Sequence, residues 1–289
     1  MEVKKVTEAP FKSYSNRTYR SEIENKIFVG RGEVGSMANE VNHSVKTTEK
    51  SLEIMAMLKE LDGARIHELE DRVDMTKGAI HNHLSTLRKH NYVTQEESEY
   101  RLSLQCLTLG GYARNNVPLY KVGRPKAIQL AEDTGMLVNL AQEEGGKGVY
   151  LYQSRGEYAV NLDTHVGYRI RLHNIAVGKA ILAYLSRERI DEIVEKWGLP
   201  EATESTITDK NELLAELQKT RERGYSIDHE ERTKGLACIG APVRVDDEVL
   251  GAISISAPTR RLGDGNFDDE LIGEVVSTAN ELELDLKYK

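Results

Sequence analysis

The chain has 289 residues, of which 39% are hydrophobic and 30% are charged, and it contains two cysteines. This length predicts two domains, and the composition is typical of folded globular proteins rather than of disordered, collagen-like or disulfide-rich ones. No run approaches the roughly 18 apolar residues of a membrane span, and the first residues lack an apolar signal-peptide core. We therefore expect a cytoplasmic protein without a membrane partner.

The formal net charge of −8 is unevenly distributed along the chain. Residues 1–36 carry +2, residues 37–114 carry −2, and residues 115–289 carry −8. A chain with this balance is not a basic nucleic-acid coat protein, so any contact with DNA has to come from a local basic patch. Cys106 and Cys238 have no Cys or His partners at zinc spacing, so we expect neither a disulfide framework nor a structural metal.

Residues 1–36 show no sustained apolar period and end in a glycine-rich stretch, from which we expect a disordered leader and arm over residues 1–45. Helical periodicity begins only after Met37, which favours Met37 as the biological start. The alternative is an arm that touches DNA phosphates. The residues available for that contact are Lys4, Lys5, Lys12, Arg17 and Arg20.

Residues 46–108 have the pattern of a winged helix-turn-helix domain. Thr47 or Thr48 can cap a first helix, and a second helix is expected from Ile66 to Val73. The apolar residues of the first helix, which lie mostly on one face, are Leu52, Ile54, Met55, Leu58 and Leu61.

A third helix is expected from Lys77 to His90, with Ile80, Leu84 and Leu87 facing the core. The stretches Tyr92–Thr94 and Tyr100–Leu102, separated by a polar turn, are expected to form the two strands of a wing. The alternative is a three-helix protein-interaction domain whose polar face is only solvated. The strand pair after the third helix favours the DNA-binding interpretation.

The outward face of the third helix supplies the candidates for base contacts. With Ile80 pointing inward, a rotation of about 100° per residue places Asn82 on the opposite face, where its amide can read adenine. Thr76 and Lys77 at the helix start suit phosphates. His81 and His83 lie about 200° apart and cannot share a metal ion. The predicted DNA-binding residues are Thr76, Lys77, Gly78, Asn82, Ser85 and Lys89.

The remainder of the chain is expected to be an α+β domain of residues 125–289 after a linker helix over 109–124. The boundary is placed at Gly123-Arg124-Pro125, because a residue before proline is biased away from helix. The expected strands are 137–142, 149–154, 158–162, 237–245 and 249–256. The expected helices are 126–134, 177–185, 190–197, 212–223 and 267–286.

A small-molecule site is expected where polar groups interrupt apolar strands. Ser254 and Ser256 share one face of a strand whose other face carries Ile253 and Ile255. A helix start near Gly178 offers free N–H groups that suit a carboxylate. The alternative is that both serines face solvent.

The residue types at this site also allow an enzymatic alternative. Cys238, His173 and Asp228 match a nucleophile, a base and an orienting acid, but no nucleophile motif surrounds Cys238. On that second interpretation Cys238 is a catalytic thiol, whereas otherwise it is a small buried hydrophobe and Asp228 caps a turn. A third class is a signalling adaptor that binds a protein instead of DNA.

The chain resembles the IclR family of transcriptional regulators over residues 46–286. The resemblance is carried by KGAIHNHLSTLRKHNYV and YRLSLQCLTLGGYAR, by VGYRIRLHNIAVGKAILAYL, and by ERGYSIDHEERTKGLACIGAPVRVDDEVLGAISISAPTRRL. The third helix is most similar to archaeal members, in which Gly78-Ala79 replaces a common Ser-Thr pair. This departure leaves the usual base contacts undetermined at those two positions.

The resemblance implies a winged helix-turn-helix followed by a GAF-like effector-binding domain. It implies a regulator without a cofactor or catalytic activity, which binds a double-stranded DNA operator as a homodimer or dimer of dimers. The effector is expected to be an organic acid or a sugar-derived metabolite. The positions that match the family's effector pocket are Ala176, Val177, Asp228, Cys238, Ser254 and Ser256.

Overall fold

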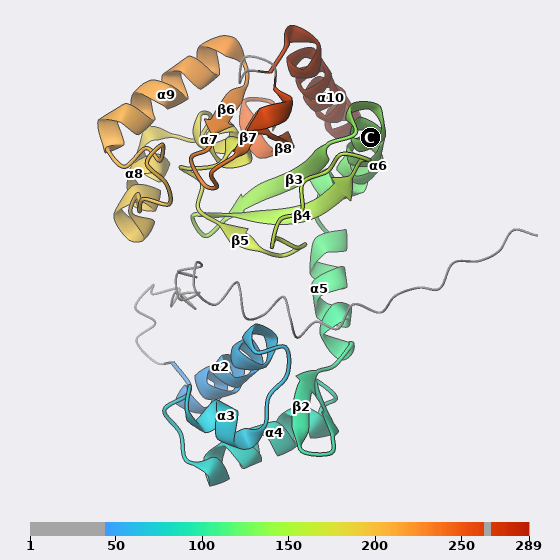
Figure 1. Cartoon of the computed structure of the whole chain (residues 1–289), viewed down its shortest axis with the longest axis vertical. Coiled ribbons are helices and arrows are strands. Elements are labelled where there is room, and N and C mark those ends of the chain that lie inside the picture. The colour runs from blue at the N-terminus through green and yellow to red at the C-terminus, as the bar shows by residue number, and fades with distance from the viewer. Residues whose placement is uncertain (1–43, 263–266, 289) are drawn as a thin grey trace, which may run out of the picture. The chain divides into compact units, whose positions relative to one another are not determined.

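The computed structural model describes residues 44–262 and 267–288, which form two compact units that divide between Leu102 and Ser103 (Figure 1). Each unit has a buried core of its own. The predicted leader, including Met37, lies outside the described residues except for its last two positions. No helix of the described part is long and apolar enough to cross a membrane.

The first unit has the elements of a winged helix-turn-helix domain, as predicted. Its core gathers residues from every element, among them Ile54, Leu69, Ile80 and Tyr100. The two strands pair antiparallel, with Val93 opposite Leu102. The elements are α2 (Lys46–Glu60), α3 (Ile66–Glu70), α4 (Lys77–Lys89), β1 (Val93–Glu96) and β2 (Glu99–Leu102).

Three details of the first unit differ from the prediction. The N-cap position of α2 is Val45 and no side chain caps it, so Thr47 and Thr48 lie inside the helix and the predicted cap is wrong. Leu52 is 60% exposed, because it lies off the face of α2 that buries Ile54 and Leu58. Finally, α3 ends at Glu70, three residues early.

The second unit is an α+β domain built on one six-stranded sheet, in the order β5-β4-β3-β8-β7-β6 with all neighbours antiparallel. The strands are β3 (Leu137–Glu144), β4 (Lys147–Arg155), β5 (Arg169–Ile170), β6 (Ser226–His229), β7 (Leu236–Val245) and β8 (Glu248–Pro258). The α-helices are α5 (Gln105–Asn115), α6 (Pro118–Thr134), α7 (Ala176–Leu182), α8 (Arg187–Trp197), α9 (Lys210–Arg223) and α10 (Asp269–Tyr288). A short 3-10 helix, η1 (Thr259–Arg261), follows β8.

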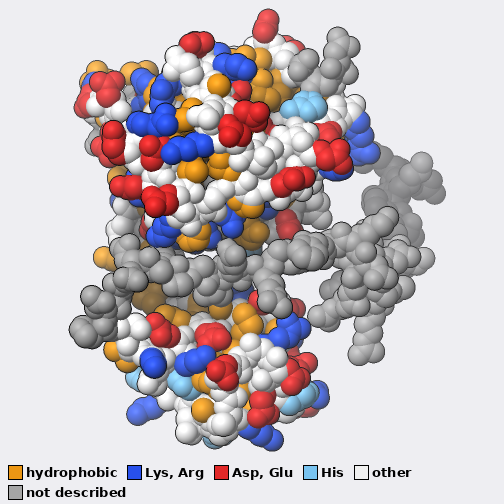
Figure 2. Space-filling view, turned by 90° about the vertical axis from the view of Figure 1, so that its left-hand side faces the viewer, with side chains coloured by type: hydrophobic (Ala, Val, Ile, Leu, Met, Phe, Trp, Pro, Cys, Tyr) orange, Lys and Arg blue, Asp and Glu red, His pale blue; other side chains and the backbone are white. Residues whose placement is uncertain are grey.

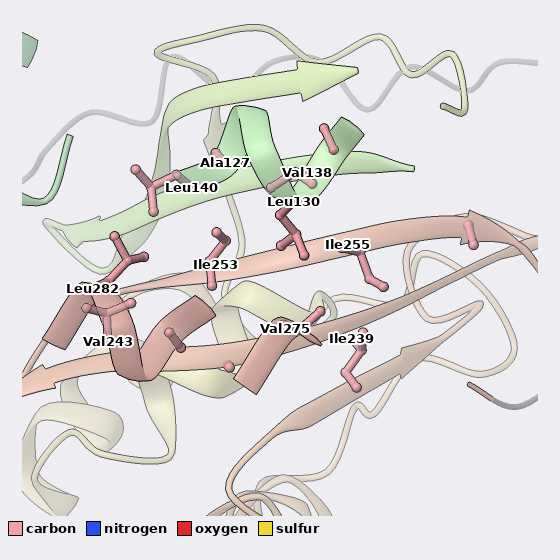
Figure 3. Packing of buried hydrophobic residues seen from close by; sticks show 14 of the residues in the cluster. Ala127, Leu130, Val138, Leu140, Ile239, Val243, Ile253, Ile255, Val275 and Leu282 are labelled. Carbon is pink, nitrogen blue, oxygen red and sulfur yellow. The ribbon is translucent and has the colours of Figure 1, made fainter. Parts of the chain in front are cut away.

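One face of the sheet packs against α6 and α10 in an apolar layer. Leu130 of α6 and Val275 of α10 point into the same cluster as Ile253 and Ile255 of β8 (Figure 3). The β-branched residues of the strands fit this flat, fully buried surface. Figure 1 shows α6 with α10 on one side of the sheet and α8 with α9 on the other.

The opposite face of the sheet is covered by α7. A Cβ atom on Gly240 would lie 2.9 Å from the carbonyl carbon of Ala176, so α7 lies directly on β7 only because residue 240 is glycine. The Ser226 hydroxyl donates to the Ala176 carbonyl at 2.6 Å. Beyond α7, the apolar residues of α8 and α9 complete a second core.

Two sequence predictions in the second unit are wrong. The helix expected from Lys126 begins at Pro118 and contains Pro125. An interior proline costs about 3 kcal/mol, and the burial of Leu119 and Ala127 on either side offsets that cost. Residues 158–162 are not a strand, and the N–H of Tyr158 donates to the carbonyl of Gly135, which follows α6, at 2.7 Å. The short strands β5 and β6 were not predicted.

Candidate functional site

The first candidate site is the outward face of α4. Its three apolar positions are buried, and every predicted DNA-binding residue is exposed, from Thr76 to Lys89. The Thr76 hydroxyl accepts a hydrogen bond from the Ala79 N–H at 3.4 Å and caps the helix. A Cβ atom on Gly78 would meet nothing within 4 Å, so the start of α4 is open to a close approach. The helical-wheel prediction of exposure is therefore confirmed.

Positive and negative side chains are mixed on the surface of the described structure. In the view of Figure 2, Lys and Arg side chains stand among Asp and Glu side chains on both units. The first turn of α4 carries no acidic residue, and its last turn carries Arg88 and Lys89. Arg88 donates to Gln95 of the wing at 2.6 Å. The face shown in Figure 2 therefore carries mixed charges and not one broad basic area.

The two histidines of α4 lie in different surroundings. The ring of His83 lies 2.8 Å from the Ser51 hydroxyl of α2, which fits a residue at the edge of the packed face. His81 is exposed. Within the described residues, no group of three or more His, Cys, Asp or Glu side chains is placed to hold a metal ion.

The second candidate site lies on the α7 face of the sheet. The register of β6, β7 and β8 places Asp228 opposite Cys238 and Cys238 opposite Ser256. On β3, Asn139 lies opposite Ser254. Asp228 and both serines are 2% exposed, so the alternative that the serines face solvent is wrong.

Hydrogen bonds join side chains of four neighbouring strands, β7, β8, β3 and β4. The Cys238 thiol lies 3.1 Å from the Ser256 hydroxyl, which also receives the Asn139 amide at 3.4 Å. Gln153 of β4 donates to Asn139 at 2.8 Å and to Thr164 at 2.9 Å. Asp228 and Ser254 belong with these side chains by strand register and burial. We call the whole group the polar cluster; its members are Asn139, Gln153, Thr164, Asp228, Cys238, Ser254 and Ser256.

The two candidates at the start of α7 lie in different environments. Ala176 packs with Leu236 and Cys238 against Val160 and Leu162, at the edge of the polar cluster. The side chain of Val177 is 2% exposed and packs in the core that α8 and α9 complete. The structure thus brings together Ala176, Asp228, Cys238 and the two serines, but not the Val177 side chain.

A buried ion pair lies beside Asp228. Lys179 of α7, with 1% of its surface exposed, bonds the carboxylate of Glu231, whose N–H donates to Asp228 at 2.8 Å. Hydroxyls of Thr203 and Thr206 donate to the Glu231 carbonyl, at 3.2 and 2.6 Å. Burial, and then the charge of Glu231, raises the pKa of Asp228 to about 7. The segment after β6 is therefore fixed to both α7 and the 203–206 loop.

In the described structure, no hydrogen bond joins His173 to Cys238 or Asp228, the residues of the alternative catalytic trio. The His173 ring lies 3.2 Å from the Pro200 carbonyl, and burial lowers its pKa to about 4. Burial raises the pKa of the Cys238 thiol far above neutrality, so the thiol stays protonated and is a poor nucleophile. Cys238 instead bonds Ser256.

Comparison with known proteins agrees with this architecture. Residues 47–97 match the model of the IclR helix-turn-helix domain, and residues 111–284 match that of the bacterial transcriptional regulator IclR C-terminal domain. The chain belongs to the IclR family of transcriptional regulators. It is therefore a transcriptional regulator with a DNA-binding helix-turn-helix, as its relatives are.

IclR-family relatives match most of the chain. The probable HTH-type transcriptional regulator ArcR of Halobacterium salinarum is 34% identical over 82% of this chain and 92% of its own length. The HTH-type transcriptional regulator KdgR of Escherichia coli is 34% identical over 81% of this chain and 88% of its own. The crystal structure of Thermotoga maritima IclR shares the fold, with a TM-score of 0.72, 24% identity, and coverage of 84% and 99% of the two chains.

Sequence reasoning missed several members of the second site. Asn139 interrupts the apolar run of β3, and Lys179 interrupts that of α7. A polar residue inside an apolar stretch is the signal that would have identified both. Gln153, Thr164 and Glu231 carry no such signal, because their neighbours in the sequence are mostly polar.

Proposed function

We propose that this IclR-family regulator acts in the cytoplasm on a double-stranded DNA operator, and that a small organic ligand in the polar cluster changes its affinity for DNA. The observation that carries the proposal is the set of buried hydrogen-bonding groups on one sheet face, around Ser254 and Ser256. Burying polar groups is costly, and an apolar layer would stabilise the fold better. A binding role explains why the polar groups are retained.

The chemistry of the cluster fits an organic acid or a sugar-derived metabolite. Hydroxyl, amide and carboxyl groups converge there beside the apolar wall of Ala176 and Leu236, as in sites where a few polar groups orient a small ligand. A solved IclR homolog from Microbacterium hydrocarbonoxydans, with a TM-score of 0.68, 19% identity and coverage of 78% and 91% of the two chains, is complexed with 4-hydroxybenzoate. That likeness supports the fold, and the ligand class is our proposal.

DNA contact is proposed for the exposed face of α4. Asn82 reads a base edge in the major groove, with Ser85 and Lys89 on the same face. Lys77 and Thr76 contact phosphates, and Gly78 allows the backbone to come close.

A homodimer is the proposed functional form. Four large apolar side chains at and within α5 are 58–81% exposed, and no residue of α5 is buried. Exposed apolar surface of this kind is typical of protein–protein contacts, and a second copy would also match two operator half-sites. These side chains are Leu104, Leu107, Leu109 and Tyr112. A ligand then acts through its different affinities for two arrangements of the dimer.

The ligand site is tested by operator binding of the Ser254→Ala/Ser256→Ala double variant. Titration calorimetry with candidate organic and sugar acids first identifies a ligand for the unmodified chain. That ligand should change operator affinity about 5- to 150-fold, the usual range of coupling. The double variant should lose this response and keep its ligand-free DNA affinity. A wild-type response in the variant would place the ligand elsewhere.

The DNA site is tested by a matched pair of substitutions on α4. Asn82→Ala should relax preference at one base position by about 1–3 kcal/mol. Lys77→Ala should weaken binding to all sequences and reduce its salt dependence. Equal losses on operator and random DNA for both variants would remove Asn82 from the proposed contact face.

A further inference from the structure

Side-chain hydrogen bonds join α4 to the three elements that pack against it, α2, α3 and β1. At the start of α4, its first N–H donates to the Glu70 carboxylate of α3 at 3.2 Å. Near the middle, the His83 ring lies 2.8 Å from the Ser51 hydroxyl of α2. At the end, Arg88 donates to Gln95 of β1 at 2.6 Å. These bonds are spread along the helix, so they can fix its orientation as well as its attachment.

The bond between Ser51 and His83 restrains the rotation of α4 more tightly than the other two. Both side chains are short and half-buried, whereas Glu70 and Arg88 are exposed. An exposed pair of long side chains loses rotamer freedom and competes with water. The bond to Glu70 comes from a backbone N–H, which points along the helix axis, and it therefore tolerates rotation about that axis.

The Ser51 hydroxyl is itself anchored to the backbone of α2. It donates to the Thr47 carbonyl at 3.2 Å. A hydroxyl has one proton, so its oxygen is left to accept a hydrogen bond, and the Nδ1 atom of His83 is the donor. Nδ1 carries a hydrogen both in this neutral tautomer and in the protonated ring. The connection from the main chain of α2 to α4 is therefore the same in both charge states of the histidine.

The apolar side of α4 opposes rotation less strongly. It packs through Ile80, Leu84 and Leu87, and apolar attraction has no preferred direction, whereas a hydrogen bond weakens steeply when it is bent. Side chains end about 5–6 Å from a helix axis, so a rotation of about 20° would move the Asn82 amide by about 2 Å. A shift of that size breaks a hydrogen bond to a base. His83 follows Asn82 directly, so holding one residue also directs the other.

We propose that Ser51 and His83 are positioning residues for sequence recognition, because their hydrogen bond fixes the rotation of α4 and so directs Asn82 at a base edge. This inference rests on the proposed DNA contact of α4. Contacts to phosphates depend less on rotation, since the lysine side chain is long and flexible and its ammonium acts as a point charge. The bond therefore controls discrimination between sequences more than attraction to DNA in general.

The test starts with a pool of randomised DNA duplexes, from which the full chain and its Ser51→Ala variant each select the sequences that they bind. The ratio of affinity for the selected duplex to affinity for random DNA should fall about 2- to 10-fold in Ser51→Ala, as expected for one hydrogen bond. Affinity for random DNA at matched salt should not change. A loss of folded protein lowers both affinities equally and leaves their ratio unchanged. An unaltered ratio in Ser51→Ala overturns the proposal.

Variants of His83 test whether the hydrogen bond is the cause. His83→Leu should lower the ratio as Ser51→Ala does, whereas His83→Asn places an amide donor near the position of Nδ1 and should keep most of it. The double variant Ser51→Ala/His83→Leu should lose no more than either single variant, because all three lack the same bond. Losses that add would show that the two residues act separately, against the proposal.

The matched control for stability is Ile54→Val, also on α2. It removes a buried methyl group from the core of the first unit and leaves the bond between Ser51 and His83 in place. The control should lower the thermal stability of the first unit without changing the ratio. A ratio that falls as far in Ile54→Val as in Ser51→Ala would assign the effect to stability and would contradict a positioning role.

The outcomes separate this inference from the function on which it rests. If Asn82→Ala relaxes the preference at one base position and Ser51→Ala relaxes none, the DNA site is correct and the positioning role is wrong. If Asn82→Ala leaves every preference unchanged, the proposed contact face itself is wrong, and the positioning role with it. Ser51→Ala should relax the position that Asn82→Ala relaxes, and relaxation confined to a different position would also contradict the proposal.

Discussion

The two faces of the six-stranded sheet are made by alternate residues of the same strands, yet they have opposite chemistry. On β8, Ile253 and Ile255 pack in the layer with α6 and α10, whereas Ser254 and Ser256 face α7. All four side chains are buried to the same extent, within 2% exposure. Each buried isoleucine contributes roughly 1.5–3 kcal/mol by leaving water, whereas a hydrogen-bonded serine contributes little net stability.

This contrast teaches that burial alone does not identify a structural core. The apolar face stabilises the domain. The polar face contributes less to the free energy of unfolding and holds hydrogen-bonding groups in a fixed arrangement. The single tryptophan of the chain, Trp197, lies in the second unit, so its fluorescence reports the unfolding of that unit in the full chain. The following substitutions compare the two faces by the change that each causes in the free energy of unfolding.

The largest effect is expected from Lys179→Met on the polar face. Removing the ammonium leaves the Glu231 carboxylate buried, and its Oε2 atom has no hydrogen-bond partner within the described structure. Breaking a buried pair on one side costs about 3–5 kcal/mol. Urea unfolding followed by Trp197 fluorescence measures the loss. Adding Glu231→Gln should recover much of it, and a double variant as unstable as the single one would contradict this account.

On the apolar face, Ile255→Ala is expected to cost about 3 kcal/mol, because it removes buried methyl groups and leaves a cavity in the layer of Figure 3. The same urea experiment applies. Ile255→Val is the graded control, with a loss of about 1 kcal/mol. If both substitutions cost the same, cavity formation is not the cause.

The raised pKa of Asp228 predicts that the stability of the folded chain depends on pH, with a definite sign. Its pKa of about 7 in the folded chain exceeds the value of roughly 3.9 expected when unfolded, so the folded state keeps a proton that the unfolded state has lost. Stability should therefore fall as pH rises from about 4 to 7, by up to about 1.4 kcal/mol per pH unit from this group, and then level off. Asp228→Asn should flatten that part of the unfolding curve. Parallel curves for the two proteins would contradict the assignment.

The smallest effect is expected from Ser256→Ala, at about 1 kcal/mol. The substitution removes a hydroxyl that meets the Asn139 amide and the Cys238 thiol, without creating a large cavity. Measured beside Ile255→Ala, it compares adjacent residues of one strand. A loss as large as that of Ile255→Ala would mean that the two faces contribute equally to stability.

Local patterns were enough to predict the elements whose signals lie within one stretch of sequence. The start of α4 is predicted to the residue, because a capping threonine precedes a clear helical period. The alternation of Ile and Ser on β8 predicts both of its faces. These features need no knowledge of the rest of the chain.

The remaining parts depend on contacts between distant residues. Lys179 and Glu231 are 52 positions apart, and periodicity gives the face of a residue but not its partner. For the same reason Val177 was placed in the ligand site, although its side chain packs in another core. The start of α6 was predicted too late because of Pro125; tertiary packing outweighs the local cost of a proline in a helix.

The alternation on β8 also constrains how its neighbours can align with it. A slip of one position against β3 or β7 would turn Ser254 and Ser256 into the layer of α6 and α10 and would turn Ile253 and Ile255 against the polar cluster. Each unpaired hydroxyl in an apolar layer costs roughly 1–3 kcal/mol, so the shifted alignment is disfavoured at several positions at once. The side chains proposed to bind the ligand thus also specify a single alignment of the strands. Substitutions that change the ligand preference therefore have to keep the alternation of apolar and polar residues on β8.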